Sequence, residues 1–175
     1  MKPRHSRNPA KTAPSHRVKI TRVKTHREAR ELDRLDAEVW GSRNPAKHRY
    51  FGQFLWAGMR VYRATVGGRL AGASTLAGAF ITGYGTSANL MELEELMVLP
   101  AFRRMGVGAA CLEFAKQEAR KRGHLGIVVE VDARNRRARD WYRRNGLATV
   151  GWVMVDNKRA WIEEERPVRP KGGRG

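Results

Sequence analysis

The most informative segment of this 175-residue chain is Leu96–Ala109, which reads LMVLPAFRRMGVGA. Strand-forming apolar residues run up to a proline, a short loop follows, and Gly106 and Gly108 open a helix pattern. The unpaired amides of a first helical turn bind phosphate, and glycines let a ligand approach the bare backbone. Arg103 and Arg104 add positive charge at the same point. The segment predicts a phosphate-binding loop, although taken alone it also fits an ordinary helix start.

Two familiar phosphate loops do not fit this segment. The dinucleotide-binding pattern has a third glycine where this chain has Cys111, and its glycines follow the strand directly. The P-loop ends in Gly-Lys-Ser/Thr, which does not follow Gly108 here. If the loop binds phosphate, it therefore does so in a site of neither of these two kinds.

Outward from this segment, apolar periodicity and turn residues predict a mixed α/β domain. Gly67-Gly68 fits a two-residue primed turn, so we expect a β-hairpin there. Strict alternation on the strand before Pro100 would place Glu92, Glu94 and Leu96 on one face and Glu95 on the other. The expected strands are 18–23, 60–66, 69–80, 90–99, 127–131, 148–155 and 159–165, and the expected helices are 28–40, 44–59, 106–122 and 135–145.

The two ends of the chain differ in composition from its middle. Residues 1–17 hold three prolines and few apolar side chains, so we expect a disordered basic arm there, and 166–175 reads as a flexible tail. Residues 18–165 are the expected folded domain. No apolar run reaches the roughly 20 residues of a transmembrane helix. The single cysteine, Cys111, fits a reducing compartment, so we expect a cytoplasmic protein.

Positive charge is concentrated in two parts of the chain, whose formal net charge is +18. Residues 1–30 carry ten lysines and arginines against one acid, and 99–147 carry twelve against five. Such a field attracts polyanions such as nucleic acid, the ribosome or a phosphorylated cofactor. The arm is either a solvated tail or a polyanion-binding arm, and the arginine-rich helix is either a solvated face or a nucleic-acid surface. The basic segments lack the interleaved aromatics that single-strand binding needs.

Two motifs together resemble one enzyme family. Arg103-x-x-Gly106-x-Gly108 resembles the Q/R-x-x-G-x-G/A pyrophosphate loop of the GNAT acetyltransferases. Asn135-x-x-Ala138-x-x-Trp141-Tyr142-x-x-x-Gly146-Leu147 is similar to that family's N-x-x-A-x-x-(aromatic/Leu)-Tyr-x-x-x-G-F block, with leucine in place of the common phenylalanine. The resemblance covers roughly 18–165. It implies the GNAT fold, an α/β architecture with a mixed central sheet of about seven strands and helices on both faces. It also implies acetyl-CoA as co-substrate, without a metal.

The resemblance further implies which residues bind acetyl-CoA. Backbone groups of Leu96 and Val98 would pair with the pantetheine arm, and the amides from Arg104 to Ala109 would hold the pyrophosphate. Asn135 would contact the arm, although its position equally suits a helix N-cap. The complete implied set is Leu96, Met97, Val98, Arg103, Arg104, Met105, Gly106, Val107, Gly108, Ala109, Asn135 and Tyr142.

Three residues are candidates for acid–base chemistry. Tyr142 aligns with the family's general acid, which protonates the departing CoA thiolate, although it also fits a core aromatic. Glu130 lies in a block that resembles bacterial ribosomal-protein alanine N-acetyltransferases, in which a glutamate is the base, and valines flank it. Asp132 departs from that subfamily, which usually has a basic residue there. Glu92 matches the base position of histone-acetyltransferase-type enzymes, or else belongs to a solvated strand end. We prefer Glu130 as the base.

We therefore expect direct transfer of acetyl from acetyl-CoA to a primary amine on a protein N-terminus, a lysine, or a small or RNA-tethered molecule. The alternative is a catalytically inactive protein of this fold that binds nucleic acid or the ribosome. The acceptor pocket would involve the first helices, residues 82–89 and the closing hairpin, where Trp40, Trp56 and Trp152 either line the pocket or pack in the core. The five histidines show no metal-ligand spacing, so no metal site is predicted.

Overall fold

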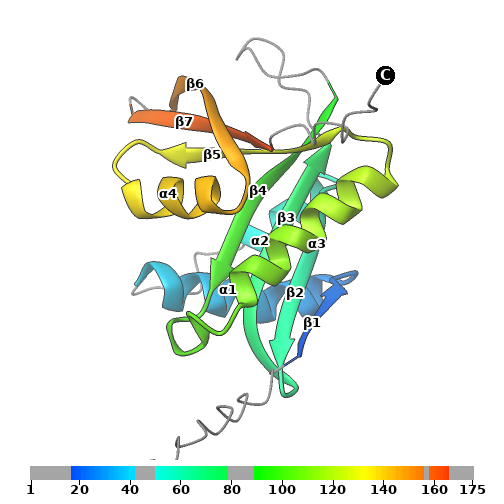
Figure 1. Ribbon diagram of the computed structural model, residues 1–175. Coiled ribbons are helices and arrows are strands. Elements are labelled where there is room, and N and C mark those ends of the chain that lie inside the picture. Colours follow the sequence, from blue (N-terminus) through cyan, green and yellow to red (C-terminus); the bar gives the residue numbers. More distant parts are fainter. Residues whose placement is uncertain (1–16, 42–49, 79–88, 156–157, 166–175) are drawn as a thin grey trace, which may run out of the picture.

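The computed structural model describes residues 17–41, 50–78, 89–155 and 158–165, which form one mixed sheet with helices on both faces (Figure 1). The elements in chain order are β1 (Val18–Arg22), α1 (His26–Trp40), α2 (Tyr50–Trp56), β2 (Arg60–Val66), β3 (Arg69–Gly78), β4 (Leu90–Val98), a short 3-10 helix (Pro100–Phe102), α3 (Val107–Lys121), β5 (Gly126–Asp132), α4 (Arg136–Arg144), β6 (Leu147–Val155) and β7 (Lys158–Glu165). None of these helices is long and apolar enough to cross a membrane.

The observed elements confirm the predicted order. Most bounds differ from the prediction by one or two residues. The largest difference is α2, which ends at Trp56, while 44–49 lie outside the described residues. The predicted arm and tail also lie outside them, apart from Arg17. The hairpin turn is as expected, since Gly67 and Gly68 have φ values of 57° and 79°, the left-handed region that a primed turn requires.

The sheet has seven strands in the order β1-β2-β3-β4-β5-β7-β6. All neighbouring strands pair antiparallel except β4 and β5, which are parallel and are connected through α3. The parallel ladder contains only three residue pairs and ends at Glu92 opposite Val128. Beyond this point the two strands diverge, as the differing directions of β4 and β5 in Figure 1 show.

A β-bulge in β4 corrects the alternation predicted for its glutamates. Glu92 pairs with Ala77 and Glu95 pairs with Thr75, so Glu94 is an extra residue without its own partner on β3. Because Thr75 and Ala77 are two residues apart, they share a face of β3, and their partners Glu92 and Glu95 therefore share a face of β4. The prediction that Glu95 points away from Glu92 is wrong.

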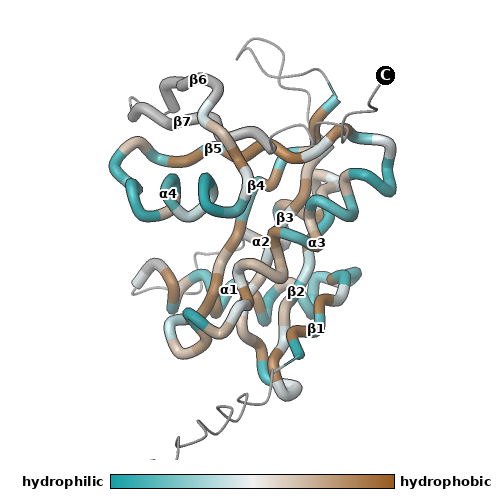
Figure 2. Tube along the Cα trace, viewed as in Figure 1, coloured by the Kyte–Doolittle hydropathy of each residue, from teal (hydrophilic) through white to brown (hydrophobic). Residues whose placement is uncertain are grey.

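Apolar clusters on the two faces of the sheet hold the helices. On one face α3 packs Leu112 and Ala115 onto Leu76, Met91 and Ile127, and Trp141 and Tyr142 of α4 join this cluster. On the other face α1 and α2 contribute residues to a cluster with β2, β3 and β4 whose members include Leu32, Leu35, Phe51, Val61, Ala73 and Met97. Both layers bury apolar residues of the sheet, and many strand residues are accordingly brown in Figure 2.

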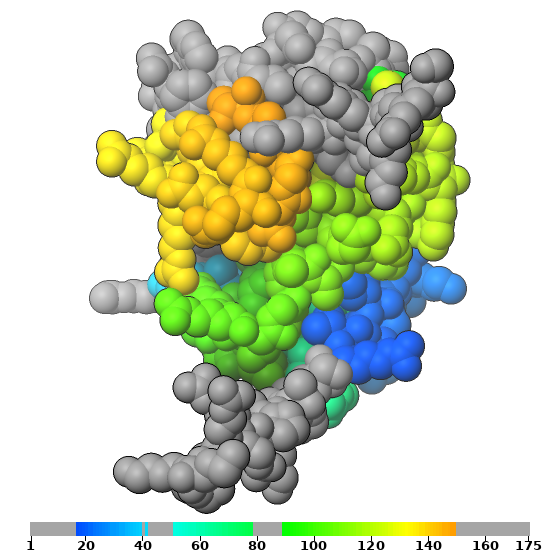
Figure 3. Space-filling model, in the orientation of Figure 1, coloured from blue at the N-terminus to red at the C-terminus, as the bar shows by residue number. Residues whose placement is uncertain are grey.

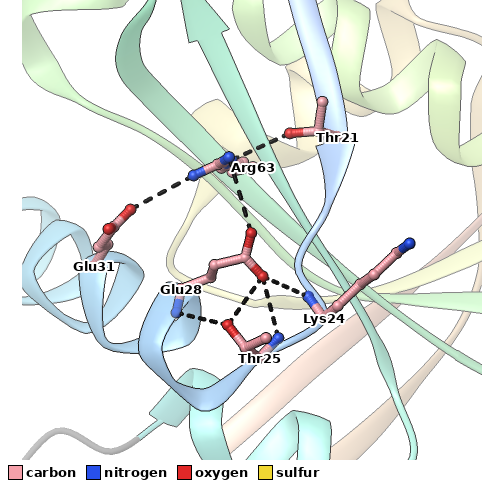
Figure 4. Close-up of polar contacts among 6 residues, drawn as sticks. All are labelled: Thr21, Lys24, Thr25, Glu28, Glu31 and Arg63. Atoms are coloured by element: carbon pink, nitrogen blue, oxygen red, sulfur yellow. Dashed lines mark hydrogen bonds and ion pairs between the residues drawn. The ribbon is translucent and has the colours of Figure 1, made fainter.

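The start of α1 is fixed by a capping box and by one arginine of β2 (Figure 4). The Thr25 hydroxyl accepts from the Glu28 amide at 3.2 Å, and the Glu28 carboxylate accepts from the Thr25 amide at 3.1 Å. The Lys24 amide also donates to Glu28, and this hydrogen bond is the main cause that lowers the pKa of Glu28. Arg63 forms ion pairs with Glu28 and Glu31 at 3.9 and 3.5 Å, which ties α1 to the sheet.

Candidate active site

The segment that joins β4 to α3 forms a loop rich in left-handed backbone. Arg104 has a φ of 64° and is the only non-glycine with a positive φ among the described residues. Gly106 has a φ of 82° and is the N-cap of α3, with no side chain to satisfy the helix amides. Since the first amides of a helix have no partner within it, those after Gly106 point into the loop as donors. This geometry supports the predicted phosphate-binding loop.

Gly108 brings α4 against this helix start. A Cβ built on Gly108 would lie 3.4 Å from Cζ2 of Trp141 and 3.6 Å from Cγ2 of Val98. The indole of Trp141 and the side chain of Val98 therefore occupy the space next to the bare Gly108 backbone. Sequence reasoning placed Trp141 only in a motif, and its contact with Gly108 shows that its indole also lines the site.

A groove of about 740 Å³ lies between the start of α3, the length of α4 and the end of β4. In Figure 3 the yellow-to-orange α4 and the green segment near residue 100 border a recess. The groove contains every residue of the predicted acetyl-CoA set except Met105. Its lining residues are Val39, Leu96, Met97, Val98, Phe102, Arg103, Arg104, Gly106, Val107, Gly108, Ala109, Asn135, Arg137, Ala138, Trp141, Tyr142 and Arg144.

The divergence of β4 and β5 opens a strand edge beside this groove. From Leu93 onward β4 pairs only with β3 in the described part of the chain, so its other edge carries no parallel strand. Leu96 and Val98 lie on this part of β4 and line the groove. An extended ligand with amide groups fits such an edge, because it can pair with the strand as another strand would.

Three glutamates gather where the strands part. The pKa of Glu92 is raised to about 7, chiefly by burial and then by the negative charges of Glu94 and Glu130. The pKa of Glu130 is also raised, by burial and by Glu94. Glu130 itself is exposed, although its valine neighbours are buried, so its side chain does not lie inside the core. Glu92 is half-buried and has the stronger perturbation.

Tyr142 faces the groove from α4. Its ring is half-buried and packs edge-on against Trp141, with ring centroids 5.0 Å apart. Burial, followed by the negative charge of Glu95, raises the pKa of the phenol. Tyr142 therefore keeps its proton through the neutral pH range and can act as a hydrogen-bond donor.

Asn135 is the N-cap of α4. Its side-chain oxygen accepts from the Ala138 amide at 3.1 Å, which confirms the capping role. Asn135 also lines the groove, so contact with a ligand stays a prediction. Of the tryptophans considered for an acceptor pocket, Trp56 is 87% exposed, and the side chains of Trp40 and Trp152 lie outside the description.

A second hollow, of about 910 Å³, lies away from this site. It lies beside β1, an edge strand of the sheet, and is lined by Arg17, Lys19 and Arg63 among others. Within the described ranges no group of three or more histidine, cysteine or acidic side chains is arranged to hold a metal ion.

Comparisons with known proteins agree with this geometry. A protein-family profile described as Acetyltransferase (GNAT) family matches residues 25–147. No curated protein matches the chain. Among solved structures, the ribosomal-protein-S18-alanine N-acetyltransferase of Escherichia coli is 19% identical with a TM-score of 0.67, over 89% of this chain and 97% of that one.

Two further structures are similar over nearly their whole length. PaiA N-acetyltransferase of Thermoplasma acidophilum, solved with coenzyme A, is 18% identical with a TM-score of 0.64, over 86% of this chain and 99% of that one. A GNAT-family acetyltransferase of Bacillus cereus is 16% identical with a TM-score of 0.64, over 87% and 99%. At these identities the structural likeness concerns the fold, and the profile match concerns the family.

Proposed function

The chain belongs to the GNAT family of acetyl-CoA-dependent acetyltransferases, and we propose that it acetylates a primary amine by direct attack of the amine on the thioester. The observation that carries this proposal is the position of the groove relative to the glutamates. Glu92 ends the β4–β5 ladder, and Leu96 and Val98 follow on the same strand as groove residues. A thioester at the strand divergence would therefore lie between a phosphate loop on one side and perturbed carboxylates on the other.

The proposed phosphate contacts follow from the loop. The amides after Gly106, together with Arg103 and Arg104, would hold the pyrophosphate of acetyl-CoA, because the helix start supplies donors and the guanidiniums supply charge. The pantetheine amides would pair with the free edge of β4 at Leu96 and Val98. Trp141 would cover the arm from α4.

The proposed chemistry needs one proton acceptor and one donor. The amine nitrogen bonds to the thioester carbon, the carbon–sulfur bond breaks, and the nitrogen loses a proton to a carboxylate directly or through water. We place Glu92 first for this role, ahead of Glu130. Its pKa of about 7 lies near the operating pH, so much of the carboxylate is ionised there and accepts a proton more readily than an ordinary glutamate does. Tyr142 would donate to the sulfur as it leaves.

The acceptor amine belongs to a protein N-terminus, a lysine, or a small or RNA-tethered molecule. The likeness to the Escherichia coli ribosomal-protein enzyme and the formal charge of +18 both favour an acceptor that a ribosome or an RNA presents. The rival function is an inactive binding protein of the same fold. The groove argues against this rival, because its loop, its aromatic wall and Tyr142 are assembled together.

Calorimetric titration with acetyl-CoA tests the proposal. We expect micromolar or tighter binding to the wild type and at least a tenfold loss in Gly106→Glu, since the carboxylate would repel the pyrophosphate. The matched control is Gly123→Glu, which adds the same charge at a glycine of similar φ (80° against 82°) with open space around it. Gly123 lies between α3 and β5, outside the groove. If wild type and both variants fail to bind acetyl-CoA, the inactive alternative is the better reading.

A further inference from the structure

The solvent side of α4 consists almost entirely of arginine. Its inward residues, Ala138, Trp141 and Tyr142, pack on the core. The rest of the helix forms a surface that we name the arginine face, and its cations are Arg136, Arg137, Arg139, Arg143 and Arg144, with Asp140 as its one acid. Figure 2 shows α4 as a largely hydrophilic helix, below β5 and to the left of β4 in this view.

Several of these cations have no anionic partner. Arg143 forms an ion pair with Asp140 at 3.8 Å and donates to Thr149, so its charge is partly satisfied. In contrast, Arg136, Arg137 and Arg144 are exposed and form no ion pair within the described ranges. These three positive charges lie on one short helix without an acid to balance them, and the fold does not require them. They become favourable only when an anion binds.

The composition of the face indicates what kind of anion. All five cations are arginines, whose planar guanidinium forms two parallel hydrogen bonds with a phosphate, whereas lysine acts as a point charge. A lipid surface would also need apolar side chains to insert, and α4 has none that is both large and strongly exposed. A row of phosphates along nine helical residues, about 13 Å, fits a nucleic-acid backbone.

The arginine face and the groove share residues. Arg137 and Arg144 line the groove together with Arg103 and Arg104, whereas Arg136 does not line it. A guanidinium that pairs with a phosphate of acetyl-CoA attracts a second phosphate much less, because its single positive charge is already balanced and the two phosphates repel each other. Two phosphorylated ligands therefore cannot both use Arg137 and Arg144.

We propose that the arginine face of α4 binds the phosphate backbone of a nucleic acid, and that nucleic acid and acetyl-CoA exclude each other through Arg137 and Arg144. The exclusion rests on the proposed function, because it requires acetyl-CoA in the groove. By linkage, each ligand weakens the other by the same factor. Acetyl transfer would then be suppressed while a nucleic-acid backbone occupies the arginine face, so an RNA or ribosome that presents an acceptor has to contact the protein outside this face.

Fluorescence anisotropy with a labelled 20-base-pair RNA duplex tests nucleic-acid binding in the full-length protein. Three phosphate contacts predict a slope of about −3 for log K against log salt concentration, on top of the contribution of other cations. Arg136→Glu should weaken RNA binding at least tenfold and change the acetyl-CoA affinity less than twofold. The control Arg30→Glu makes the same charge change on an exposed arginine of α1 and should have a much smaller effect.

The mutual exclusion is tested by the same anisotropy assay in the presence of saturating acetyl-CoA, which should weaken RNA binding at least tenfold. RNA affinity that stays constant with bound acetyl-CoA would overturn the exclusion. Equal losses in Arg136→Glu and Arg30→Glu would overturn the site, because net charge alone would then explain binding. Tighter binding to phosphatidylserine vesicles than to RNA would overturn the choice of nucleic acid. Calorimetry that detects no acetyl-CoA binding refutes the proposed function and the exclusion, whereas the RNA site still stands or falls on Arg136→Glu.

Discussion

Replacement of Glu92 by glutamine should stabilise the protein at alkaline pH while it impairs catalysis. Glu92 is half-buried, and its carboxylate lies near the negative charges of Glu94 and Glu130, so its pKa is raised from 4.5 to about 7. A raised pKa means that the folded protein holds this proton more tightly than the unfolded chain does. The resulting stability is present below pH 4.5 and is lost as the pH rises through 7. Glutamine resembles the protonated acid and carries no charge, so it avoids the free-energy cost of a buried carboxylate.

The size of the effect follows from the shift in pKa. Each pKa unit corresponds to about 1.4 kcal/mol, which gives roughly 3 kcal/mol for a fully desolvated carboxyl. Glu92 retains contact with water, and solvent screening reduces this figure to about 1–2 kcal/mol. For a protein of this size that free energy raises Tm by about 3–6 °C. The repulsion from Glu94 and Glu130 is already part of this shift in pKa, so it is not added a second time.

Differential scanning calorimetry of wild type and Glu92→Gln between pH 4.5 and 8.5 measures the effect. The two melting temperatures should agree within about 1 °C at pH 4.5 and diverge by about 3–6 °C at pH 8.5, with the variant more stable. Glu38→Gln is the control, because it makes the same chemical change at an exposed position of α1. A difference in Tm that is independent of pH, or a variant less stable at pH 8.5, would refute the proposed desolvation of Glu92.

Three further outcomes are expected. Tyr142→Phe should lower the rate of acetyl transfer about 10²-fold or more, with little change in acetyl-CoA affinity, because it removes only the donor to the leaving sulfur; single-turnover kinetics check this. Asn135→Ala should destabilise the protein by about 1 kcal/mol in urea unfolding through loss of the Ala138 cap, and Asn135→Asp should retain most of that stability. Cys111 is buried and burial raises its pKa to about 12, so Ellman's reagent should label it only after unfolding. Labelling of the native protein at pH 8 would show that α3 opens.

Local chemistry accounts for what was predictable in this fold. A Gly67-Gly68 pair between two strand patterns predicts a tight turn, and the positive φ values of both glycines confirm it. The loop before α3 was likewise readable from Gly106 and Gly108, because a left-handed cap and a close contact both need glycine. The turn and the left-handed cap depend on neighbours in the chain, so a single sequence contains them, whereas the contact of Gly108 with the distant Trp141 comes from the fold.

The bulge of β4 was missed, although the sequence holds a signal for it. Apolar residues stand at Met91 and Leu93, and the next is Leu96, a spacing of three in a strand whose period is two. That spacing indicates an inserted residue, which the structure confirms at Glu94. The reason given for preferring Glu130 also failed, because its buried valine neighbours do not make the side chain itself buried. The meeting of Glu92 and Glu130 depends on strand order, which periodicity does not contain.

The short β4–β5 ladder makes the sheet resemble two pages of an open book. β1–β4 form one page and β5–β7 the other, and α3 runs along the spine because it packs on both β4 and β5. The angle between these two groups of strands, rather than the shape of either group, sets the width of the groove at the strand divergence. A longer or shorter β4–β5 ladder would change that angle without a change in any residue that lines the groove. The width of the groove can therefore change through the residues of the ladder alone, while the side chains that line the groove stay the same.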